Sequence, residues 1–489
     1  MNSKTLIKGK IHYVGVNDRQ KHLFERLLPL PCGVSYNSYL IDDEQVTLID
    51  TVEADFFEVY LQKIRRIIGD RPVKYLVVNH MEPDHSGSIR FITQAYPDIT
   101  LVGNAKTFEM IDGYYGVKCN RLVVKEGDTL ELGHHRLCFY LVPMVHWPET
   151  MVSYDSAEQV LFSGDAFGCF GTLDGGFLDT RINTDKFWPE MVRYYSNIVG
   201  KYGNPVQRAL AKLSGVPLAA ICSTHGPVWT ENIRKVVGIY DRLSRYEAEE
   251  GVVIAYGTMY GHNEEMAEEI ASELSALGVK NIVMHNVSKS DFSYILADVF
   301  RYKGLIVGAP TYNGNIYPPV ENLLNKVMQS EVKDRCFGWF GSFTWAGAAV
   351  KKIADLTEKG KFVKVGEPVE FKQAMKEDDL KHCAFNVDGP IPPDTLFAKA
   401  KCGQYDGCVA MYHDQGHIPF KVVGFNWNKE TGKMETVEGV NITLGLPIIR
   451  VSVDHGTAFD VAGKGIASPD ALLLSIDYAS KMAKNRKKA

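Results

Sequence analysis

Six consecutive residues, His80 to His85, include four side chains that can bind a metal. They read His-Met-Glu-Pro-Asp-His and follow the apolar run 75–78, so we expect them where a buried strand ends in a loop. Because side chains alternate along an extended backbone, His80, Glu82 and Asp84 are predicted to project together and His85 in the opposite direction. Ligands in two directions predict a site for two metals rather than one.

Three later apolar runs, each typical of a strand, are followed by His146, Asp165 and His225. Strands set the positions of such residues and loops supply the reach, so ligands at successive strand ends predict a metal site at the edge of two sheets. Three carboxylates with four imidazoles suit iron or manganese, and a bridging carboxylate suits a redox pair. The nine cysteines include no C-x-x-C pair, which removes support for disulfides, a rubredoxin centre or an ordinary iron–sulfur site.

The elements that would position these ligands are visible in the same part of the chain. Residues 36–49 predict a hairpin around the polar turn 42–44. Apolar residues at helical spacing from Phe56 to Ile67 predict a helix that Gly69 ends.

A different pattern begins at Gly251. The apolar run 252–256 is typical of a buried parallel strand, and it opens into the loop 257–263 before a helix. Free backbone N–H groups and the helix dipole favour an anion at such a junction. Two more strands end in the loops 310–315 and 342–347, and a doubly wound sheet would gather all three loops at its carboxyl edge.

Length and charge limit the remaining possibilities. A chain of 489 residues is too long for one core and suggests two to four domains. A net charge of −5 argues against a nucleic-acid partner, and no apolar run is long enough to span a bilayer. We therefore expect a cytoplasmic protein that binds neither nucleic acid nor membrane.

The first 384 or so residues resemble the flavodiiron proteins, also called A-type flavoproteins. The resemblance rests on the runs 31–40, 78–88 and 143–148. It implies an α/β multidomain fold: a metallo-β-lactamase-like αββα sandwich over residues 1–248, then a flavodoxin-like doubly wound parallel sheet over residues 251–384.

The resemblance also implies a ligand set for two irons. One iron would take His80, Glu82 and His146, the other Asp84, His85 and His225, and Asp165 would bridge the pair. Zinc hydrolases of the same fold usually carry H-x-H-x-D-H, and here Glu82 replaces the middle histidine. A dinuclear zinc hydrolase that activates a metal-bound hydroxide is the alternative function.

The flavodoxin-like half implies that FMN binds at the three loops. Its implied contacts are Thr258, Met259, Tyr260, Gly261, His262, Asn263, Pro310, Thr311, Tyr312, Asn313, Gly314, Ser342, Phe343, Thr344, Trp345, Ala346 and Gly347. The family usually has Thr or Ser at the position of Asn263, whose amide can still donate a hydrogen bond to a phosphate. Tyr194, Tyr195 and Phe24 are implied to line the metal pocket.

By resemblance, the predicted reaction is reduction of O2 to water, of NO to N2O, or of both, with electrons relayed by FMN. The family brings its flavin and diiron centres together across a head-to-tail homodimer, so we expect such a dimer, or a dimer of dimers. The electron donor is expected to be separate, such as rubredoxin or a reduced deazaflavin.

The last hundred or so residues, 386–489, look like the C-terminal third of the 4-hydroxythreonine-4-phosphate dehydrogenase family. On that pattern His413 would bind a metal, and Lys421, Asn441 and Arg450 would contact a phosphorylated substrate. The upstream two-thirds of that family are missing here, along with two histidine ligands. We expect a truncated α/β segment, a remnant fusion or an assembly artefact, in which NAD-dependent oxidation of a phosphorylated hydroxy acid is inactive.

Overall fold

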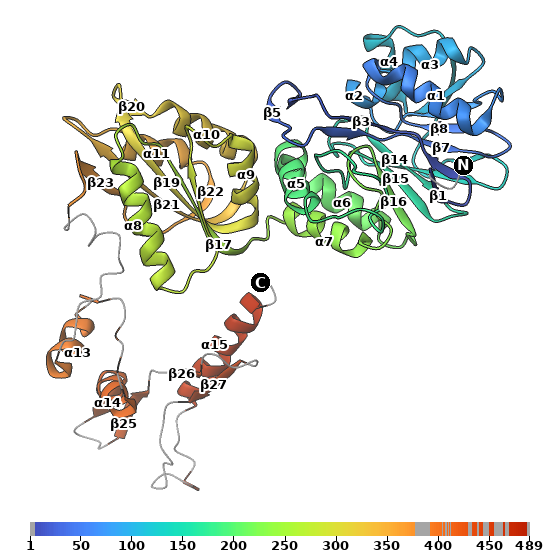
Figure 1. Ribbon diagram of the computed structural model, residues 1–489. Coiled ribbons are helices and arrows are strands. Elements are labelled where there is room, and N and C mark those ends of the chain that lie inside the picture. The colour runs from blue at the N-terminus through green and yellow to red at the C-terminus, as the bar shows by residue number, and fades with distance from the viewer. Residues whose placement is uncertain are drawn as a thin grey trace. The chain divides into compact units, whose positions relative to one another are not determined.

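The computed structural model describes residues 5–376 and, in the C-terminal segment, residues 392–402, 404–405, 408, 410, 412–428, 433–437, 440–443, 449–453, 463–464 and 469–486. The chain divides into two compact units, Met1–Phe385 and Asn386–Ala489 (Figure 1). Among the described residues, no helix combines the length and apolar character needed to cross a bilayer.

Two sheets form the first half of the larger unit. The first sheet has the order β1 (Leu6–Lys8), β2 (Ile11–Tyr13), β7 (Tyr39–Ile41), β8 (Thr47–Ile49), β9 (Tyr75–Val77), β10 (Thr100–Gly103) and β11 (Asn120–Val123). The second has the order β12 (Thr129–Glu131), β13 (Arg136–Leu141), β14 (Met151–Asp155), β15 (Val160–Gly164) and β16 (Ala220–Ser223). Short strands pair β3 (Val16–Asp18) with β6 (Val34–Tyr36), and β4 (Leu23–Phe24) with β5 (Leu28–Pro29).

Helices cover the outer faces of both sheets (Figure 1). Along the first lie α1 (Phe57–Ile68), which follows the short turn η2 (Ala54–Phe56), α3 (Ile89–Ala95) and α4 (Ala105–Tyr114). Along the second lie α5 (Phe187–Tyr194), α6 (Gly203–Leu213) and α7 (Ile233–Ser244), with η3 (Tyr195–Val199) and η4 (Gly200–Tyr202) between α5 and α6. This layering is the expected αββα sandwich.

The predicted hairpin and helix are both confirmed. β7 and β8 pair antiparallel, with Leu40 opposite Leu48. In α1 the buried stripe includes Tyr60 and Ile64, whereas Val59, which fits the same spacing, is 49% exposed.

A second, doubly wound sheet forms the rest of the larger unit. Its parallel strands follow the order β18-β17-β19-β21-β22, with β23 also on β21, which is the flavodoxin order. The strands are β17 (Glu249–Tyr256), β18 (Ile282–Asn286), β19 (Tyr302–Tyr312), the short antiparallel β20 (Asn315–Ile316), β21 (Lys333–Phe343), β22 (Lys361–Lys364) and β23 (Val369–Lys372). The helices are α8 (His262–Ala276), α9 (Phe292–Arg301), α10 (Pro318–Gln329) and α11 (Ala349–Thr357).

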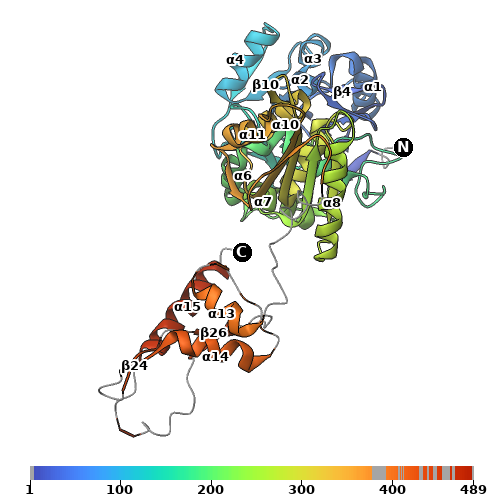
Figure 2. The same cartoon turned by 90° about the vertical axis from the view of Figure 1, so that its left-hand side faces the viewer.

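Alternation along β17 explains how both faces of this sheet are covered. Ile254 and Tyr256 pack with Met266 of α8, while Val253 and Ala255 join the core that continues under the helices of the other face. Figure 2 shows α8 apart from α10 and α11. The strand begins at Glu249, two residues before Gly251, and helix α7 ends earlier, at Ser244.

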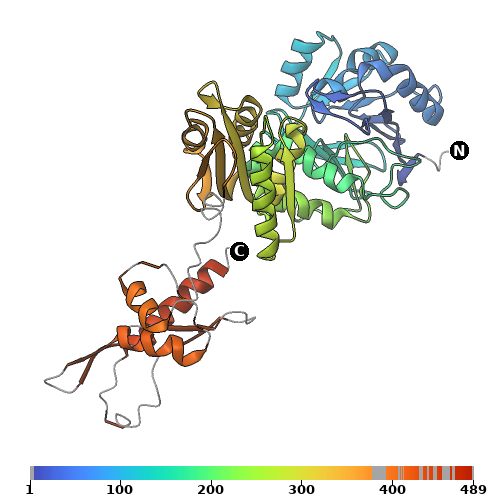
Figure 3. The ribbon, with the colours of Figure 1, turned by 60° about the vertical axis from the view of Figure 1, so that its left-hand side comes forward.

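The smaller unit appears in orange to red in Figure 3. Its described elements are α13 (Pro393–Lys401), α14 (His413–Gly424), the paired strands β24 (Phe425–Asn428) and β25 (Lys433–Val437), the paired strands β26 (Val440–Thr443) and β27 (Arg450–Val453), and α15 (Asp470–Arg486). Helix α15 lies against β26 and β27. Several of its apolar side chains, including Leu472, Leu473 and Ile476, are more than half exposed.

Candidate metal centre and flavin pocket

The run 80–85 changes conformation at Pro83. The residues before it continue out of β9, but Pro83 begins the short helix α2 (Pro83–Ser86), because proline suits the first turn of a helix, where its missing N–H is not needed. Asp84 therefore projects from a helical turn. The expectation that Glu82 and Asp84 project together, with His85 opposite, is wrong, since it assumed an extended backbone throughout.

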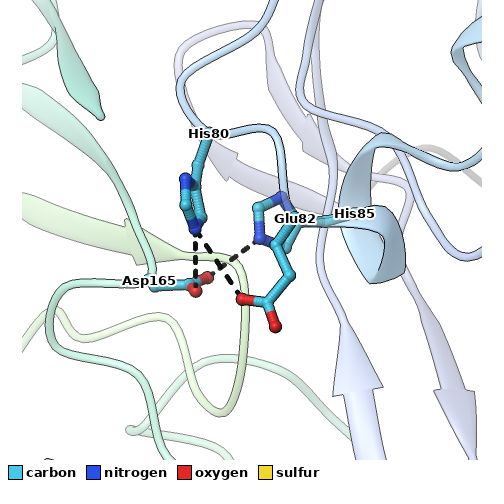
Figure 4. A group of neighbouring side chains, drawn as sticks. All are labelled: His80, Glu82, His85 and Asp165. Atoms are coloured by element: carbon cyan, nitrogen blue, oxygen red, sulfur yellow. Dashed lines mark ion pairs between the residues drawn. The ribbon is translucent and has the colours of Figure 1, made fainter. Parts of the chain in front are cut away.

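Asp165, fully buried after β15, lies at the centre of the cluster. Its Oδ2 atom is 2.9 Å from Nε2 of His146 and 3.6 Å from Nε2 of His80. The carboxylate of Glu82 approaches the same His146 nitrogen at 3.2 Å. Figure 4 shows His80, Glu82 and His85 pointing toward Asp165. One oxygen of Asp165 thus faces a group of two imidazoles and one carboxylate.

The other oxygen of Asp165 faces a second group. Oδ1 lies 3.2 Å from Nε2 of His85 and 3.6 Å from Nε2 of His225. Asp84 completes this group, with Oδ2 3.2 Å from the His225 nitrogen. The structure therefore brings together all seven residues that the sequence predicted as ligands.

The burial and bonding of this cluster fit a pair of cations. All seven residues are buried, with exposed fractions of 8% or less. Within the described residues, both carboxylate oxygens of Asp84, both ring nitrogens of His85 and Nε2 of His225 have no hydrogen-bond partner. Buried polar atoms without a hydrogen-bond partner are costly, and a cation bound among them would compensate that cost. Imidazole nitrogens and carboxylate oxygens are donors that iron and manganese accept.

A second layer of contacts fixes the orientation of the imidazoles. Glu149, absent from the sequence-based candidates, accepts a hydrogen bond from Nδ1 of His80 at 2.6 Å and another from the Met81 amide at 2.9 Å. Nδ1 of His225 donates to the carbonyl of Ser35 at 2.8 Å. In both histidines the outer nitrogen is held by an acceptor, which leaves Nε2 free to bind a metal.

The charges of the cluster balance one another when no cation is present. Burial alone would lower the pKa of His80, but hydrogen bonds to Glu149 and Glu82 raise it to about 9. Burial would also lower the pKa of His146, but the carboxylates of Asp165 and Glu82 outweigh burial and raise that pKa to about 10. The pKa of Asp165 moves the other way, well below its usual range, because the surrounding histidines outweigh its burial.

The aromatic candidates separate into two environments. The rings of Phe24 and Tyr194 lie 5.6 Å and 5.7 Å from that of His225. The hydroxyl of Tyr194 is buried and has no partner among the described residues. Tyr195 instead packs on Tyr240, at 5.0 Å, and on Phe300 of α9, at 6.2 Å. Contrary to expectation, it is a packing residue rather than part of the pocket wall.

A further carboxylate near the cluster, Glu25, is not among the candidates that the sequence predicted. Glu25 and Arg26 form the turn between β4 and β5, both with left-handed φ values, 49° and 58°. Desolvation and the neighbouring Glu82 carboxylate raise the pKa of Glu25 to about 7. No local pattern links a hairpin turn to a ligand 57 positions later, so only the folded chain shows this contact.

The loops of the doubly wound sheet, β17 to β23, enclose a pocket of about 150 Å³. Ten of the predicted flavin contacts line it: Thr258, Met259, Tyr260, His262, Asn263, Pro310, Thr311, Ser342, Phe343 and Thr344. Gln373, which the sequence did not suggest, also lines it. The remaining candidates, Gly261, Tyr312, Asn313, Gly314, Trp345, Ala346 and Gly347, are not among its lining residues. Gly261 has φ 100° and precedes α8, where its amide donates to Thr258.

Three family models match this chain. The model described as "ODP family beta lactamase" matches residues 34–226, the flavodoxin model matches residues 254–385, and the model described as "Pyridoxal phosphate biosynthetic protein PdxA" matches residues 358–479. The anaerobic nitric oxide reductase flavorubredoxin of Escherichia coli K12 is 32% identical over 384 residues, which are 77% of this chain and 80% of the relative. The chain belongs to the flavodiiron family.

Solved structures of flavodiiron proteins share this fold. The rubredoxin oxygen:oxidoreductase of Desulfovibrio gigas aligns with a TM-score of 0.75 and 29% identity, covering 78% of this chain and 95% of that one. The flavodiiron protein of Giardia intestinalis aligns with a TM-score of 0.73 and 28% identity, covering 76% and 92%. The predicted resemblance of the first 384 residues and the predicted fold class are confirmed.

One departure from the flavodiiron pattern has a structural explanation. The side-chain amide of Asn263 donates to the carbonyl of Gly257 at 2.9 Å, so it closes the loop before α8. Its Oδ1 atom is buried without a partner in the described part of the chain. The amide that could donate to a phosphate is therefore turned toward the backbone.

The candidates in the C-terminal unit lie on different elements. His413 begins α14, although its side chain falls outside the described residues. Lys421 lies on the same helix, Asn441 on β26 and Arg450 on β27. Within the described residues of this unit, no group of three potential ligands comes together.

Proposed function

We propose that this chain is an FMN-linked diiron oxidoreductase that reduces NO, O2 or both. The observation that carries the proposal is the position of Asp165, whose two oxygens face two separate groups of imidazole and carboxylate ligands. A carboxylate shared in this way suits two metals that change oxidation state together. The names of the relatives, a nitric oxide reductase and an oxygen oxidoreductase, support the same reaction class.

In this proposal the ligands divide as the two groups do. His80, Glu82 and His146 would hold one iron, Asp84, His85 and His225 the other, and Asp165 would bridge them. Glu149 would keep the Nδ1 proton on His80, so that Nε2 carries the lone pair. When bound, the two irons and the flavin together supply the electrons that reduction of the substrate requires.

The protein would contribute position and a closed environment. Tyr194 has a pKa well above its usual range because of its burial and the carboxylates of the cluster, so its hydroxyl keeps its proton. That hydroxyl can therefore donate a hydrogen bond to an oxygen atom in the pocket. Phe24 limits access of water on the same side, since its ring packs against both Tyr194 and His225.

We also propose that FMN binds in the pocket at the loops of the doubly wound sheet. The loop 257–263 ends at the N-terminus of α8, where free backbone amides favour a phosphate. Tyr260, which lines the pocket, is 85% exposed, and Trp345, which follows the lining residue Thr344, is 87% exposed, so both offer aromatic surface for a flavin and for a second subunit. Exposed aromatic residues at a pocket rim support the head-to-tail homodimer, in which a partner would cover them.

The electron donor, as proposed, is a separate protein such as rubredoxin or a reduced deazaflavin. A cytoplasmic location is part of the same proposal. For the C-terminal unit, a dehydrogenase activity has no observation in its favour beyond the family match over residues 358–479.

The decisive experiment combines content and turnover. Purified protein should contain about two irons and one flavin per chain, and should consume NO or O2 when reduced. Asp165→Asn should lose iron and activity, whereas the matched control Asp174→Asn should keep both, because Asp174 pairs with Arg19 and Lys186 at the surface. Colourless protein with zinc and hydrolytic activity would overturn the proposal in favour of the hydrolase.

A further inference from the structure

An apolar cavity of about 20 Å³ lies between helices α6 and α7 and the second sheet of the αββα half. It is distinct from the flavin pocket and shares no lining residue with it. Its lining residues are Val142, Val145, Val152, Ala166, Phe167, Val206, Ala209, Leu210, Leu213 and Tyr240.

The cavity is adjacent in sequence to two residues of the metal cluster. Val145 directly precedes His146, and Ala166 and Phe167 directly follow Asp165. The carboxylate of Asp165 also contributes to the raised pKa of Tyr240, which burial mainly causes. The inner wall of the cavity is therefore made by the same two loops that carry His146 and Asp165.

The outer wall is a single helix. Val206, Ala209, Leu210 and Leu213 recur at helical spacing on α6 and form one face toward the cavity. Val206 is buried, but the other three are only partly buried. One layer of side chains thus separates the cavity from solvent on this side.

The lining selects what can occupy the space. Tyr240 is the only lining residue with a polar side-chain atom, and a water molecule needs two to four polar partners. A cavity above about 10–15 Å³ admits one water-sized molecule, and apolar cavities of this kind stay dry and take up apolar guests. NO and O2 are uncharged diatomic molecules that are small enough for this cavity and need no polar partners.

We propose that this cavity is a holding site for an uncharged diatomic gas, from which substrate passes between α6 and the sheet toward the Asp165 side of the metal cluster. The inference rests on the proposed function for the identity of the gas. The site itself rests on the apolar lining and on the shared loops. A simple packing gap would have the same volume, so the test must show both occupancy and passage.

Occupancy is tested on the intact protein with xenon, an apolar guest that needs no turnover. Crystals of the wild-type protein under xenon pressure should show anomalous density between Ala209 and Phe167. Ala209→Phe fills the space from α6 and should abolish that density. Ala211→Phe is the matched control, because Ala211 lies on the exposed side of the same helix. Absence of xenon from the wild-type cavity would overturn the proposal.

Passage is tested by stopped-flow mixing of the reduced holoenzyme with NO or O2. Ala209→Phe should slow the second-order association by about tenfold, within the range that variants of one site usually span, and Ala211→Phe should not. Iron content, flavin content and the rate of flavin reduction should stay unchanged in both variants. Leu210→Phe provides a second filling variant if Ala209→Phe fails to fold.

The outcomes separate this inference from the proposed function. If xenon is excluded by Ala209→Phe but gas association is unchanged, the cavity is a packing gap and the inference is wrong. If the wild-type protein reacts with neither gas, the proposed function fails and the holding-site role fails with it, whatever xenon shows.

Discussion

Replacing Glu149 with glutamine should weaken metal binding without removing any proposed ligand. The Glu149 carboxylate accepts from Nδ1 of His80 at 2.6 Å and from the Met81 amide at 2.9 Å, and the residue is only 1% exposed. Glutamine can keep both hydrogen bonds through its carbonyl oxygen. It loses the negative charge, and it places an N–H donor where Oε2 of Glu149 has no partner among the described residues.

The expected size of this effect follows from two independent ranges. A hydrogen bond to a charged group contributes about 1.5–3 kcal/mol and a neutral one about 0.5–1.5 kcal/mol, so the loss is about 1–1.5 kcal/mol. Since about 1.4 kcal/mol is a factor of ten, metal affinity should fall about tenfold. That value lies at the lower end of the roughly 10- to 100-fold loss typical for residues that orient a metal ligand.

The assay is anaerobic competition between the protein and a chelator for Fe(II), followed by iron content after gel filtration. Glu131→Gln is the matched control, because Glu131 is a surface carboxylate paired with Arg136. Thermal unfolding of the metal-free forms shows whether the fold is preserved. If Glu149→Gln keeps wild-type iron affinity while remaining folded, then Glu149 does not orient His80 and the reasoning is refuted.

Three further predictions concern the protonation of the cluster, the buried Arg193 and the C-terminal unit. Metal affinity should rise as pH increases from 6 to about 9. The pKa values of His80 and His146 are about 9 and about 10 in the metal-free protein, so a metal must displace protons when it binds. Metal uptake that does not depend on pH in a chelator titration would contradict this. Arg193→Met breaks the ion pair with Glu190 and should lower the free energy of unfolding by about 2–3 kcal/mol. This is less than the full cost of breaking a buried pair, because Glu190 is partly exposed. Denaturant unfolding measures the change, and an unchanged midpoint would argue that the ion pair does not stabilise the fold. Ending the chain after Cys383 should leave iron content, flavin content and stability unchanged, because the first unit has its own core; insoluble or flavin-free protein would show the opposite.

The sequence predicted which side chains come together better than it predicted their directions. Each of His146, Asp165 and His225 follows an apolar run, and strands appear at those runs, so the strand-end rule located them correctly. The alternation rule failed between Glu82 and Asp84, because Pro83 starts a helical turn that a period of two cannot describe. Local patterns therefore identified the donors, whereas their division into two groups was implied by the family resemblance and not by spacing.

Contacts distant in sequence could not be predicted at all. Glu149 bonds to His80 across 69 positions, and no spacing rule connects a loop after β13 to the end of β9. The packing of Tyr195 away from the cluster could not be predicted either, because its neighbour Tyr194 has the same type and the π-helical turn that begins at Tyr195 has no sequence signature. Gln373 was missed for a related reason, since it follows β23 rather than one of the three predicted loops.

The wall of the metal pocket depends on the docking of the two halves of the larger unit. Phe170 packs on both Phe24 and Tyr194, with ring centres 5.3 Å and 5.0 Å away. Arg193 lies over Phe170 and also over Tyr294 of α9, at 4.5 Å from each ring. Because this guanidinium is buried between rings from two halves, a shift of α9 would move Phe170 and, through it, the aromatic wall beside His225. The second half thus helps to shape the metal pocket as well as forming the proposed flavin site.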